Sequence, residues 1–294
     1  MSGERVQAFH SAFAVESWLS QNAVLSAENR HSLAETVSRL VSRTDTDRKI
    51  TIGVAGAPGS GKSTLSRTFV HCLNEMGTTA CLLSLDDYYL DRPGRERMAR
   101  DVHPLFRQRG VPGTHDIDRL KRDHDRIRAG EIEGLQLPVF DKSEDNRMPP
   151  SHWKSLESAP QIIVIEGWCI GATPQKPAEL DDPVNDMERL RDADGSWRRT
   201  ASKAWQRMHS DLDRRLDQVW YIRVPDWDCV VDWRWQQEQE LARKNLQSRL
   251  EVMHFLACFE RIVSHMQQSC PEWADLVLDT DREHHIRQPD HQGN

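Results

Sequence analysis

The sequence has no long hydrophobic run and no excess of positive charge. No apolar stretch reaches the roughly 18 residues that a transmembrane helix needs, and the N-terminus lacks the apolar core of a secretory signal peptide. The formal net charge of −7 creates no overall basic field that would attract nucleic acid. We therefore expect a cytoplasmic protein whose partners include neither a membrane nor a nucleic acid. Any anionic ligand would be bound by local clusters of Arg and Lys.

The sequence also lacks closely spaced cysteines. None of its six cysteines belongs to a Cys-x-x-Cys pair, which argues against zinc sites and thioredoxin-like redox sites. Most of them stand in apolar segments, so we expect reduced, buried thiols. Internal repeats and low-complexity tracts are missing as well. A chain of 294 residues is long enough for one large α/β domain or two small ones.

The most informative stretch is residues 50–64, Ile-Thr-Ile-Gly-Val-Ala-Gly-Ala-Pro-Gly-Ser-Gly-Lys-Ser-Thr. A β-branched strand, a glycine-rich turn and the start of a helix together match the P-loop pattern G-x-x-x-x-G-K-[ST]. Glycines let phosphate oxygens approach the backbone, Lys62 supplies charge for the β- and γ-phosphates, and the Ser63 hydroxyl suits Mg²⁺. We predict that a nucleoside triphosphate is bound by Gly56, Ala57, Pro58, Gly59, Ser60, Gly61, Lys62, Ser63 and Thr64.

Carboxylates follow two further predicted strands. Residues 78–87 read as a largely buried strand that ends in Asp86 and Asp87, and residues 160–168 contain four consecutive β-branched residues before Glu166. Ligands of open parallel sheets bind at the carboxyl ends of the strands, so the two aspartates are candidates for the active site. The alternative is that they cap the next turn. Glu166 suits the Walker B role of holding Mg²⁺ directly or through water.

The alternation of predicted strands and helices indicates the fold. Further strands are expected at residues 217–224 and 275–281. The fold class that we predict is α/β: a P-loop NTPase-type parallel sheet of about five strands with helices on both faces, plus an N-terminal helical extension and a helical lid. The predicted division of the chain is an N-terminal helical extension at residues 1–48, a P-loop domain at 49–282 and a polar C-terminal tail at 283–294.

A long helical region after residue 225 combines an apolar stripe with basic residues. The stripe is expected to pack in the core and consists of Leu246, Leu250, Met253, Leu256, Phe259, Val263 and Met266. The basic residues Arg234 and Lys244, with Arg243 and Arg249, are candidates for a mobile lid that faces the phosphates.

Two polar loops carry further candidate ligand-binding residues. An arginine-rich segment leads into the turn-rich stretch Gly110–Asp116, where Asp116 or Thr114 is expected to cap the next helix. In the same stretch, His115 is either a loop histidine or a substrate contact. The second loop contributes three residues that suit an anionic or hydroxylated ligand: Asp141, Lys142 and Arg147.

These motifs together resemble the D-glycerate 3-kinases, a group within the P-loop kinase family that includes phosphoribulokinase, uridine kinase and pantothenate kinase. The resemblance runs from about residue 50 to residue 281 and is carried by Gly56–Thr64, Ser84–Tyr89, Arg109–Asp116, Asp141–Ser143 and Ile165–Trp168. It implies transfer of the ATP γ-phosphate to the primary hydroxyl of D-glycerate, which gives 3-phosphoglycerate. The implied cofactors are ATP and Mg²⁺.

The resemblance also implies roles for individual positions. Asp86 matches the carboxylate that accepts the hydroxyl proton, and Glu166 matches the Walker B acid. Lys62 and Ser63 take the P-loop roles, and Arg234 falls where the family's lid crosses the nucleotide. We therefore predict Asp86, Lys62 and Glu166 as catalytic residues. The predicted Mg²⁺ ligands are Ser63, Glu166 and Asp86.

The implied acceptor is a small hydroxy acid whose carboxylate requires a cation. An arginine fork matches a carboxylate bidentately, and the candidate cations are Arg109, Lys142, Arg147 and His115. The full set of predicted substrate-binding residues is Asp87, Tyr88, Arg109, His115, Asp116, Lys142 and Arg147. The relatives carry a glycine-rich Gly-Asp-Arg stretch after Asp-Lys-Ser, and this chain reads Glu-Asp-Asn-Arg at residues 144–147.

Two other functions stay open from the sequence. One is a kinase for another small hydroxylated acceptor, such as a nucleoside, a pantothenate-like acid or a sugar phosphate. The other is a nucleotide-dependent switch. A GTPase-like switch would want the guanine-reading tetrapeptide Asn-Lys-x-Asp, which does not occur in the sequence.

Overall fold

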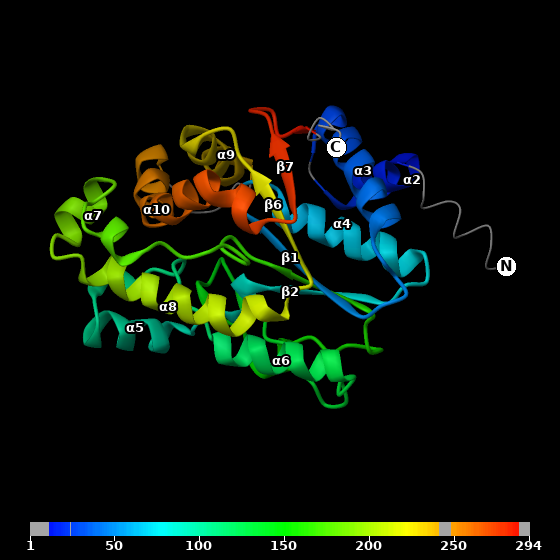
Figure 1. Cartoon of the computed structure of the whole chain (residues 1–294), viewed down its shortest axis with the longest axis horizontal. Coiled ribbons are helices and arrows are strands. Elements are labelled where there is room, and N and C mark those ends of the chain that lie inside the picture. The colour runs from blue at the N-terminus through cyan, green and yellow to red at the C-terminus, as the bar shows by residue number, and fades with distance from the viewer. Residues whose placement is uncertain (1–11, 24, 241–247, 288–294) are drawn as a thin grey trace.

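The computed structural model describes residues 12–23, 25–240 and 248–287. Within these ranges the main sheet has the strand order β2-β5-β1-β6-β7-β8, with five parallel strands and β8 antiparallel to β7 (Figure 1). Its strands are β1 (Ile50–Gly56), β2 (Ala80–Ser84), β5 (Ile162–Glu166), β6 (Gln218–Arg223), β7 (Leu276–Thr280) and β8 (Ile286–Arg287). The predicted parallel sheet of about five strands is confirmed.

Strand β5 shows why the sheet is covered on both faces. All of its residues are buried, and successive side chains of a strand point to opposite faces. Ile162 and Val164 therefore pack into one hydrophobic cluster, while Ile163 and Ile165 pack into another. A strand made of β-branched residues suits this position between two layers.

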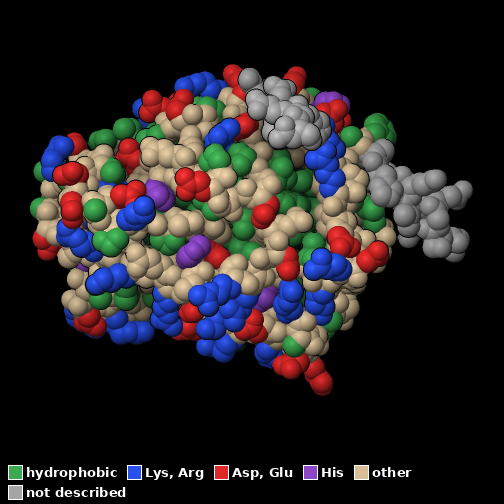
Figure 2. All heavy atoms as spheres, viewed as in Figure 1, with side chains coloured by type: hydrophobic (Ala, Val, Ile, Leu, Met, Phe, Trp, Pro, Cys, Tyr) green, Lys and Arg blue, Asp and Glu red, His purple; other side chains and the backbone are tan. Residues whose placement is uncertain are grey.

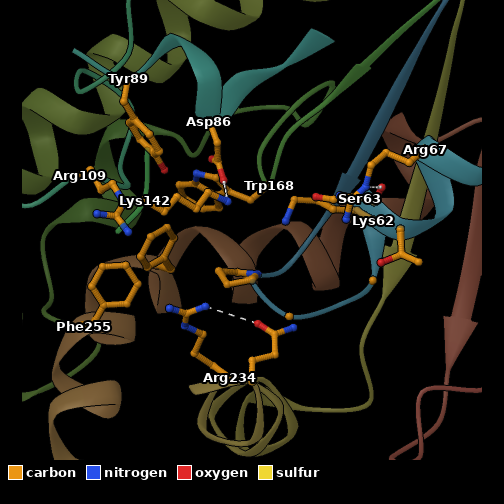
Figure 3. Close-up of a pocket in the computed structure, with 16 residues that line it drawn as sticks. Lys62, Ser63, Arg67, Asp86, Tyr89, Arg109, Lys142, Trp168, Arg234 and Phe255 are labelled. Carbon is orange, nitrogen blue, oxygen red and sulfur yellow. Dashed lines mark hydrogen bonds and ion pairs between the residues drawn. The ribbon is translucent and has the colours of Figure 1, made fainter. Parts of the chain in front are cut away.

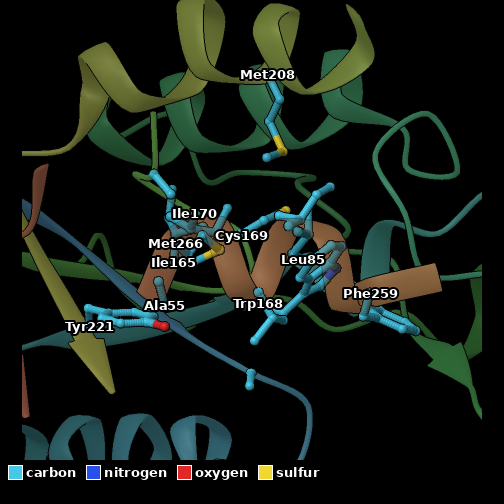
Figure 4. Close-up of a cluster of buried hydrophobic side chains, with 14 of the residues drawn as sticks. Ala55, Leu85, Ile165, Trp168, Cys169, Ile170, Met208, Tyr221, Phe259 and Met266 are labelled. Carbon is cyan, nitrogen blue, oxygen red and sulfur yellow. The ribbon is translucent and has the colours of Figure 1, made fainter. Parts of the chain in front are cut away.

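Helices form the two outer layers (Figure 1). The N-terminal helices α2 and α3 pack with α4 on one face, and α6, α8 and α10 pack on the other. The helices are α2 (Ala12–Asn22), α3 (Ala27–Arg43), α4 (Lys62–Glu75), α5 (Arg92–Asp101), α6 (Ile117–Ala129), α7 (Asp186–Arg191), α8 (Ser196–Leu212), α9 (Trp227–Glu240) and α10 (Arg249–Trp273). Figure 4 shows Met208 of α8 and Met266 of α10 in the second cluster, together with Ile165.

Short elements complete the described chain. A small antiparallel pair is formed by β3 (Phe140–Asp141) and β4 (Asn146–Arg147). The 3₁₀ turns are η1 (Leu85–Tyr88), η2 (Pro104–Arg107), η3 (Pro150–His152), η4 (Pro177–Leu180) and η5 (Asp213–Arg215).

The N-terminal helices belong to the same packed layer as the P-loop helix. The apolar face of α3 is buried, with Leu33, Val37, Leu40 and Val41. Ser32 Oγ of α3 also donates a hydrogen bond to the Ile286 carbonyl at 3.2 Å and accepts one from the Ile286 N–H at 2.9 Å. The segment predicted as a polar tail from residue 283 therefore contains the edge strand β8. The predicted domain boundary at residue 48 stays a prediction.

One part of the predicted core stripe is wrong. Leu256, Phe259, Val263 and Met266 are buried, but Leu250 and Met253 are 59% and 42% exposed. Leu250 and Met253 border an open groove beside α7 instead of facing the sheet. An apolar stripe is not buried where no second layer covers it. Leu246 lies outside the described residues.

Other expectations from composition can also be compared with the structure. All six cysteines are free thiols and five of them are buried, as predicted. Among the helices that the structure describes, none combines the length and the apolar character needed to cross a membrane. Figure 2 shows acidic and basic side chains interspersed over one face of the molecule.

Candidate active site

A cavity of about 280 Å³ opens at the carboxyl ends of β1, β2 and β5 (Figure 3). The P-loop turn and the start of α4 form one side, the segments after β2 and β5 form a second, and α9 and α10 form a third. Its lining residues are Pro58, Gly59, Gly61, Lys62, Ser63, Thr64, Arg67, Asp86, Tyr89, Arg109, Lys142, Trp168, Arg234, Gln237, Phe255 and Phe259. The fold thus brings the predicted P-loop, Asp86 and several predicted cations together.

Gly59 and Gly61 give the P-loop its turn. Their φ angles are 84° and 86°, in the left-handed region that glycine adopts without strain. Helix α4 begins at Lys62, directly after Gly61. The free N–H groups of its first turn therefore face the turn, and they stabilise an anion there. Gly56, Ala57 and Ser60 of the predicted nucleotide-binding set do not line the cavity, and Ser60 is buried.

Glu166 lies between two serine hydroxyls. Ser63 Oγ donates to one carboxylate oxygen at 3.1 Å, and Ser84 Oγ donates to the other at 2.5 Å. The parallel register aligns Ser84 with Glu166, which explains why the two meet. Hydroxyl and carboxylate oxygens are the ligands that Mg²⁺ prefers. A buried carboxylate beside the P-loop serine therefore fits a magnesium site.

Asp86 forms an ion pair with Lys142. The Lys142 Nζ lies 2.7 Å from the Asp86 carboxylate. Burial by itself would raise the pKa of the Asp86 carboxyl, but the charges of Lys142 and Lys62 outweigh burial and bring this pKa well below its usual range. Asp86 is therefore ionised at neutral pH, and it lies in the cavity between the P-loop and Arg109 (Figure 3).

Tyr89 and His115 form a stacked pair at the wall of the cavity. Their ring centroids are 4.3 Å apart, and His115 is buried behind Tyr89. Burial lowers the pKa of His115 to about 4, although the Asp86 carboxylate opposes this shift. His115 is therefore neutral at pH 7, and the prediction that it supplies a cation to the acceptor is not supported. Burial and the Asp86 carboxylate raise the pKa of Tyr89, so its hydroxyl stays protonated.

Arg109 is paired with Asp145, a residue that is not among the predicted site residues. Asp145 accepts hydrogen bonds from Arg109 Nη1 and, at 2.9 Å, from Arg95 Nη1. Both guanidinium groups also lie over the ring of Phe140, at 5.6 and 5.8 Å from its centroid. Asp145 belongs to the Glu-Asp-Asn-Arg stretch that departs from the family pattern, and its charge partly neutralises that of Arg109 in the cavity lining.

Two residues predicted to bind substrate point away from the cavity. Tyr88 is buried, and its hydroxyl donates to Asp123 at 3.1 Å. Asp87 accepts a hydrogen bond from the Phe140 N–H at 3.1 Å, and burial raises its pKa. In the 3₁₀ turn η1, which follows β2, successive side chains point in different directions. Asp86 and Tyr89 therefore point into the cavity, whereas Asp87 and Tyr88 do not.

Asp116 and Arg147 also lie outside the cavity lining. Asp116 caps α6 by accepting a hydrogen bond from the Arg119 N–H at 3.1 Å, which is the capping role the sequence allowed. Arg147 donates to the Tyr89 carbonyl at 2.8 Å and lies 3.7 Å from Asp116. These residues shape the wall and do not face the ligand space.

The predicted lid is described in part. Arg234 of α9 lines the cavity, where it donates to Glu238 and lies over the Phe255 ring. Arg249 is paired with Asp232 at 2.7 Å. Lys244 and Arg243 lie outside the described residues.

Several lining residues were not predicted from the sequence. They are Arg67, Tyr89, Trp168, Gln237, Phe255 and Phe259. Tyr89 and Trp168 stand two residues after the predicted acidic strand ends at Asp87 and Glu166, so their positions carried a signal. Phe259 belongs to the predicted core stripe of α10, whereas Phe255 stands on the same helix outside that stripe. Nothing in the sequence of this helix indicates that either aromatic residue borders a ligand cavity.

A family model matches this part of the chain. Residues 51–172 match the model described as the Phosphoribulokinase / Uridine kinase family. Over these residues the chain is similar to the kinases of that family. The chain is therefore an ATP-dependent phosphotransferase with a hydroxyl acceptor, and its P-loop binds nucleotide.

Individual relatives extend the likeness beyond the matched domain. An uncharacterized kinase of Schizosaccharomyces pombe, mug58, is 28% identical over 253 residues, which is 80% of this chain and 90% of that protein. The chloroplastic D-glycerate 3-kinase of Arabidopsis thaliana is 24% identical over 80% of this chain and 53% of the plant enzyme. The solved structure of a D-glycerate 3-kinase from Cryptococcus neoformans superposes with a TM-score of 0.65 and 20% identity, covering 87% of this chain and 94% of that one. At this identity the superposition shows a shared fold.

Proposed function

We propose that this protein transfers the γ-phosphate of ATP to the primary hydroxyl of D-glycerate and so forms 3-phosphoglycerate. The observation that carries the proposal is the order of side chains along the cavity: Lys62 at the P-loop, then Asp86, then Arg109 (Figure 3). This order suits an acceptor with a hydroxyl at one end and an anionic group at the other. The likeness to D-glycerate 3-kinases over most of the chain supports the same acceptor.

The nucleotide half of the site supplies charge and position. Phosphoryl transfer depends mainly on positioning and on neutralising the charge of the transferred group. Lys62 and Arg234 offset that charge from two sides of the cavity. Ser63 and Glu166 would hold Mg²⁺, which neutralises phosphate charge when bound. Ser84 fixes the orientation of Glu166 through its hydrogen bond.

Asp86 orients the acceptor hydroxyl and receives its proton. Its low pKa makes it a weak base, but in a loose transition state the proton leaves late, so that geometry matters more than basicity. The ion pair with Lys142 fixes the carboxylate at the edge of the cavity. Lys142 thus contributes twice, since it positions Asp86 and adds positive charge at the acceptor end.

The acceptor carboxylate is bound by Lys142 and Arg109 in this proposal. One specific observation favours a second candidate acceptor. Because Asp145 already occupies Nη1 of Arg109, the positive field at that end is reduced. A less anionic hydroxylated acceptor, such as a nucleoside, would therefore also be accommodated.

The test is ADP release with ATP and Mg²⁺, with D-glycerate, L-glycerate, uridine and pantothenate offered separately. Acceleration by D-glycerate alone, with 3-phosphoglycerate as the product, is the expected result. Acceleration by another acceptor would keep the kinase and replace the substrate. Slow hydrolysis without any acceleration, together with nucleotide-dependent binding of a partner, would overturn the proposal in favour of a switch.

A further inference from the structure

A second cavity, called the α7 groove below, lies between α7, α9 and α10, which stand together at one end of the molecule (Figure 1). It has a volume of about 530 Å³, and small-molecule sites commonly occupy about 300–1,000 Å³. None of the described residues that line it also lines the active-site cavity. The groove is therefore a separate space, and the phosphoryl transfer proposed above does not use it.

Helix α10 forms the wall between the two cavities. Phe255 and Phe259 line the active-site cavity, whereas Ala257 lines the α7 groove. Each residue of an α-helix turns by about 100°, so Ala257, two residues from each phenylalanine, points to nearly the opposite side. A molecule that fills the groove thus lies outside the space for ATP and the acceptor.

Exposed apolar side chains gather in the α7 groove. Leu190, Leu250 and Met253 are 74%, 59% and 42% exposed, and the half-buried side chain of Trp227 belongs to the same lining. Such side chains are ordinary when they are scattered, but a group of them in a concave surface indicates a binding site. Covering them removes apolar surface from water, which favours an occupant with an apolar body.

Glu260 places a carboxylate in this apolar lining. Its Oε2 accepts a hydrogen bond from the Asn185 amide at 2.9 Å. Arg261, the next residue on α10, is paired with Glu188 at 2.6 Å and does not serve as its partner. Burial raises the pKa of Glu260, and the carboxylates of Glu188 and Asp228 also raise it, in opposition to the hydrogen bond from Asn185.

The other charged side chains of the lining do not neutralise this carboxylate. Asp186 is itself acidic and is paired with Arg189 at 2.5 Å. Arg191 and His254 are exposed, and within the described ranges no Lys, Arg or His forms an ion pair with Glu260. A partly buried carboxylate without a counter-charge is stabilised by a cation that binds beside it. The groove therefore combines an apolar surface with one carboxylate that suits a cationic group.

We propose that the α7 groove binds a small organic cation, in which an amine or guanidinium group pairs with Glu260 and an apolar body covers Leu250. The ring of Trp227 suits the same class of ligand, because a cation is attracted to the face of an aromatic ring. Such a ligand contacts α9 and α10, the two helices that also carry Arg234 and Phe255 to the active site. The inference is independent of which acceptor the kinase uses.

The test compares two probes of the same shape that differ in charge, phenylbutylamine and phenylbutanol. Their affinities for the full-length protein are measured by NMR titration with a non-hydrolysable ATP analogue and Mg²⁺ present, so that the nucleotide site is filled. The amine is expected to bind about tenfold tighter than the alcohol, the gain that a hydrogen bond to a charged group gives. Glu260→Gln, which keeps an acceptor for Asn185, should reduce the affinity for the amine to that for the alcohol.

Matched variants separate the carboxylate from the apolar wall. Glu272→Gln is the control for the charge, since Glu272 is an exposed acid on the same helix outside the groove. Leu250→Ala should weaken the binding of both probes about threefold or more, because it removes apolar contact area. Val184→Ala is its control, since Val184 is 47% exposed and does not line the groove. Affinity for the ATP analogue should be unchanged in all four variants, which shows that they are folded.

Three results would overturn the proposal. The first is equal affinity for the two probes, or no binding of either. The second is an affinity for the amine that survives Glu260→Gln, since the amine would then bind elsewhere. The third is a concentration-dependent dimer in sedimentation experiments that Leu250→Ala abolishes, because the groove would then be covered by a second copy of the chain.

Discussion

The Nζ of Lys142 lies 2.7 Å from the carboxylate of Asp86. Lys142 stands in the turn between β3 and β4, whereas Asp86 follows β2, so the small β3–β4 hairpin delivers a cation to the carboxylate proposed to receive the acceptor proton. The contact makes the charge of Asp86 insensitive to pH near neutrality, because its pKa is well below the usual range. Loss of activity on mild acidification would therefore have to come from another group.

Replacing Asp86 by asparagine separates binding from chemistry. Asp86→Asn should retain ATP affinity and reduce turnover about 10²–10⁴-fold, the usual contribution of a positioned proton acceptor. Lys62→Ala should damage both quantities because the proposed role of Lys62 is to contact the β- and γ-phosphates. Calorimetry with ATP and steady-state rates on the two variants make the comparison. Near wild-type turnover in Asp86→Asn would remove Asp86 from the proposed chemistry.

Ser84→Ala should raise the Mg²⁺ concentration that gives half-maximal activity. The Ser84 hydroxyl orients the Glu166 carboxylate, and loss of such an outer hydrogen bond commonly costs about 10–100-fold in metal affinity. A Mg²⁺ titration at fixed ATP measures the shift, and Glu166→Gln should give a larger one. Ser66→Ala is the matched control, because Ser66 is buried on α4 outside the cavity lining. If Ser84→Ala behaved like the control, Glu166 would not depend on Ser84.

Asp145→Asn should change both the stability of the protein and the KM for the acceptor. Asp145 has a φ of 50°, which asparagine tolerates, so the change removes charge and preserves the turn. We expect a loss of about 1–2 kcal/mol in the free energy of unfolding; solvent screening keeps it below the cost for a fully buried pair, since the Asp145 side chain is 39% exposed.

The same variant should lower the KM for an anionic acceptor, because Arg109 is released from its partner. Urea denaturation and acceptor titrations provide the two measurements. The exposed pair of Arg100 and Asp101 supplies the control, and Asp101→Asn should change neither quantity. An Asp145→Asn variant with the same stability and KM as the Asp101→Asn control would contradict the role assigned to Asp145.

The cysteines should react slowly in the native protein. Burial raises the pKa of Cys72 and of Cys81 to about 12, and the neutral thiol is a poor nucleophile. Because these two pKa values are raised, only a very small fraction of each thiol is ionised at pH 8. The thiolate becomes the main form only above about pH 12. Alkylation followed by mass spectrometry at pH 8 should leave both residues unmodified until denaturant is added. Rapid modification of the folded protein would show that these thiols are accessible.

Local patterns were enough to predict the sheet and the P-loop, because each depends on a few adjacent residues. The strand that ends in Glu166 is a run of β-branched residues, and the turn at Gly59 and Gly61 needs residues that adopt positive φ. Which of the two neighbouring tyrosines, Tyr88 or Tyr89, faces the cavity could not be predicted from the sequence. It depends on the 3₁₀ turn η1, which rotates Tyr88 toward Asp123 and Tyr89 toward the cavity.

Contacts between distant segments were also beyond prediction. Phe255 borders the cavity because α10 and the P-loop line the same space. Asp145 meets Arg109 because the β3–β4 turn brings it there. Leu250 and Phe259 occupy the same apolar stripe, yet only Phe259 is buried. The spacing of a stripe shows which face of a helix is apolar, whereas burial depends on the layer that lies opposite.

The two hydrogen bonds between Ser32 and Ile286 have a consequence for self-association. An outermost strand normally presents unpaired N–H and C=O groups, which invite another chain to add a strand. Here one hydroxyl of α3 occupies both backbone groups of Ile286. The N-terminal extension thereby shields the end of the sheet against edge-to-edge aggregation.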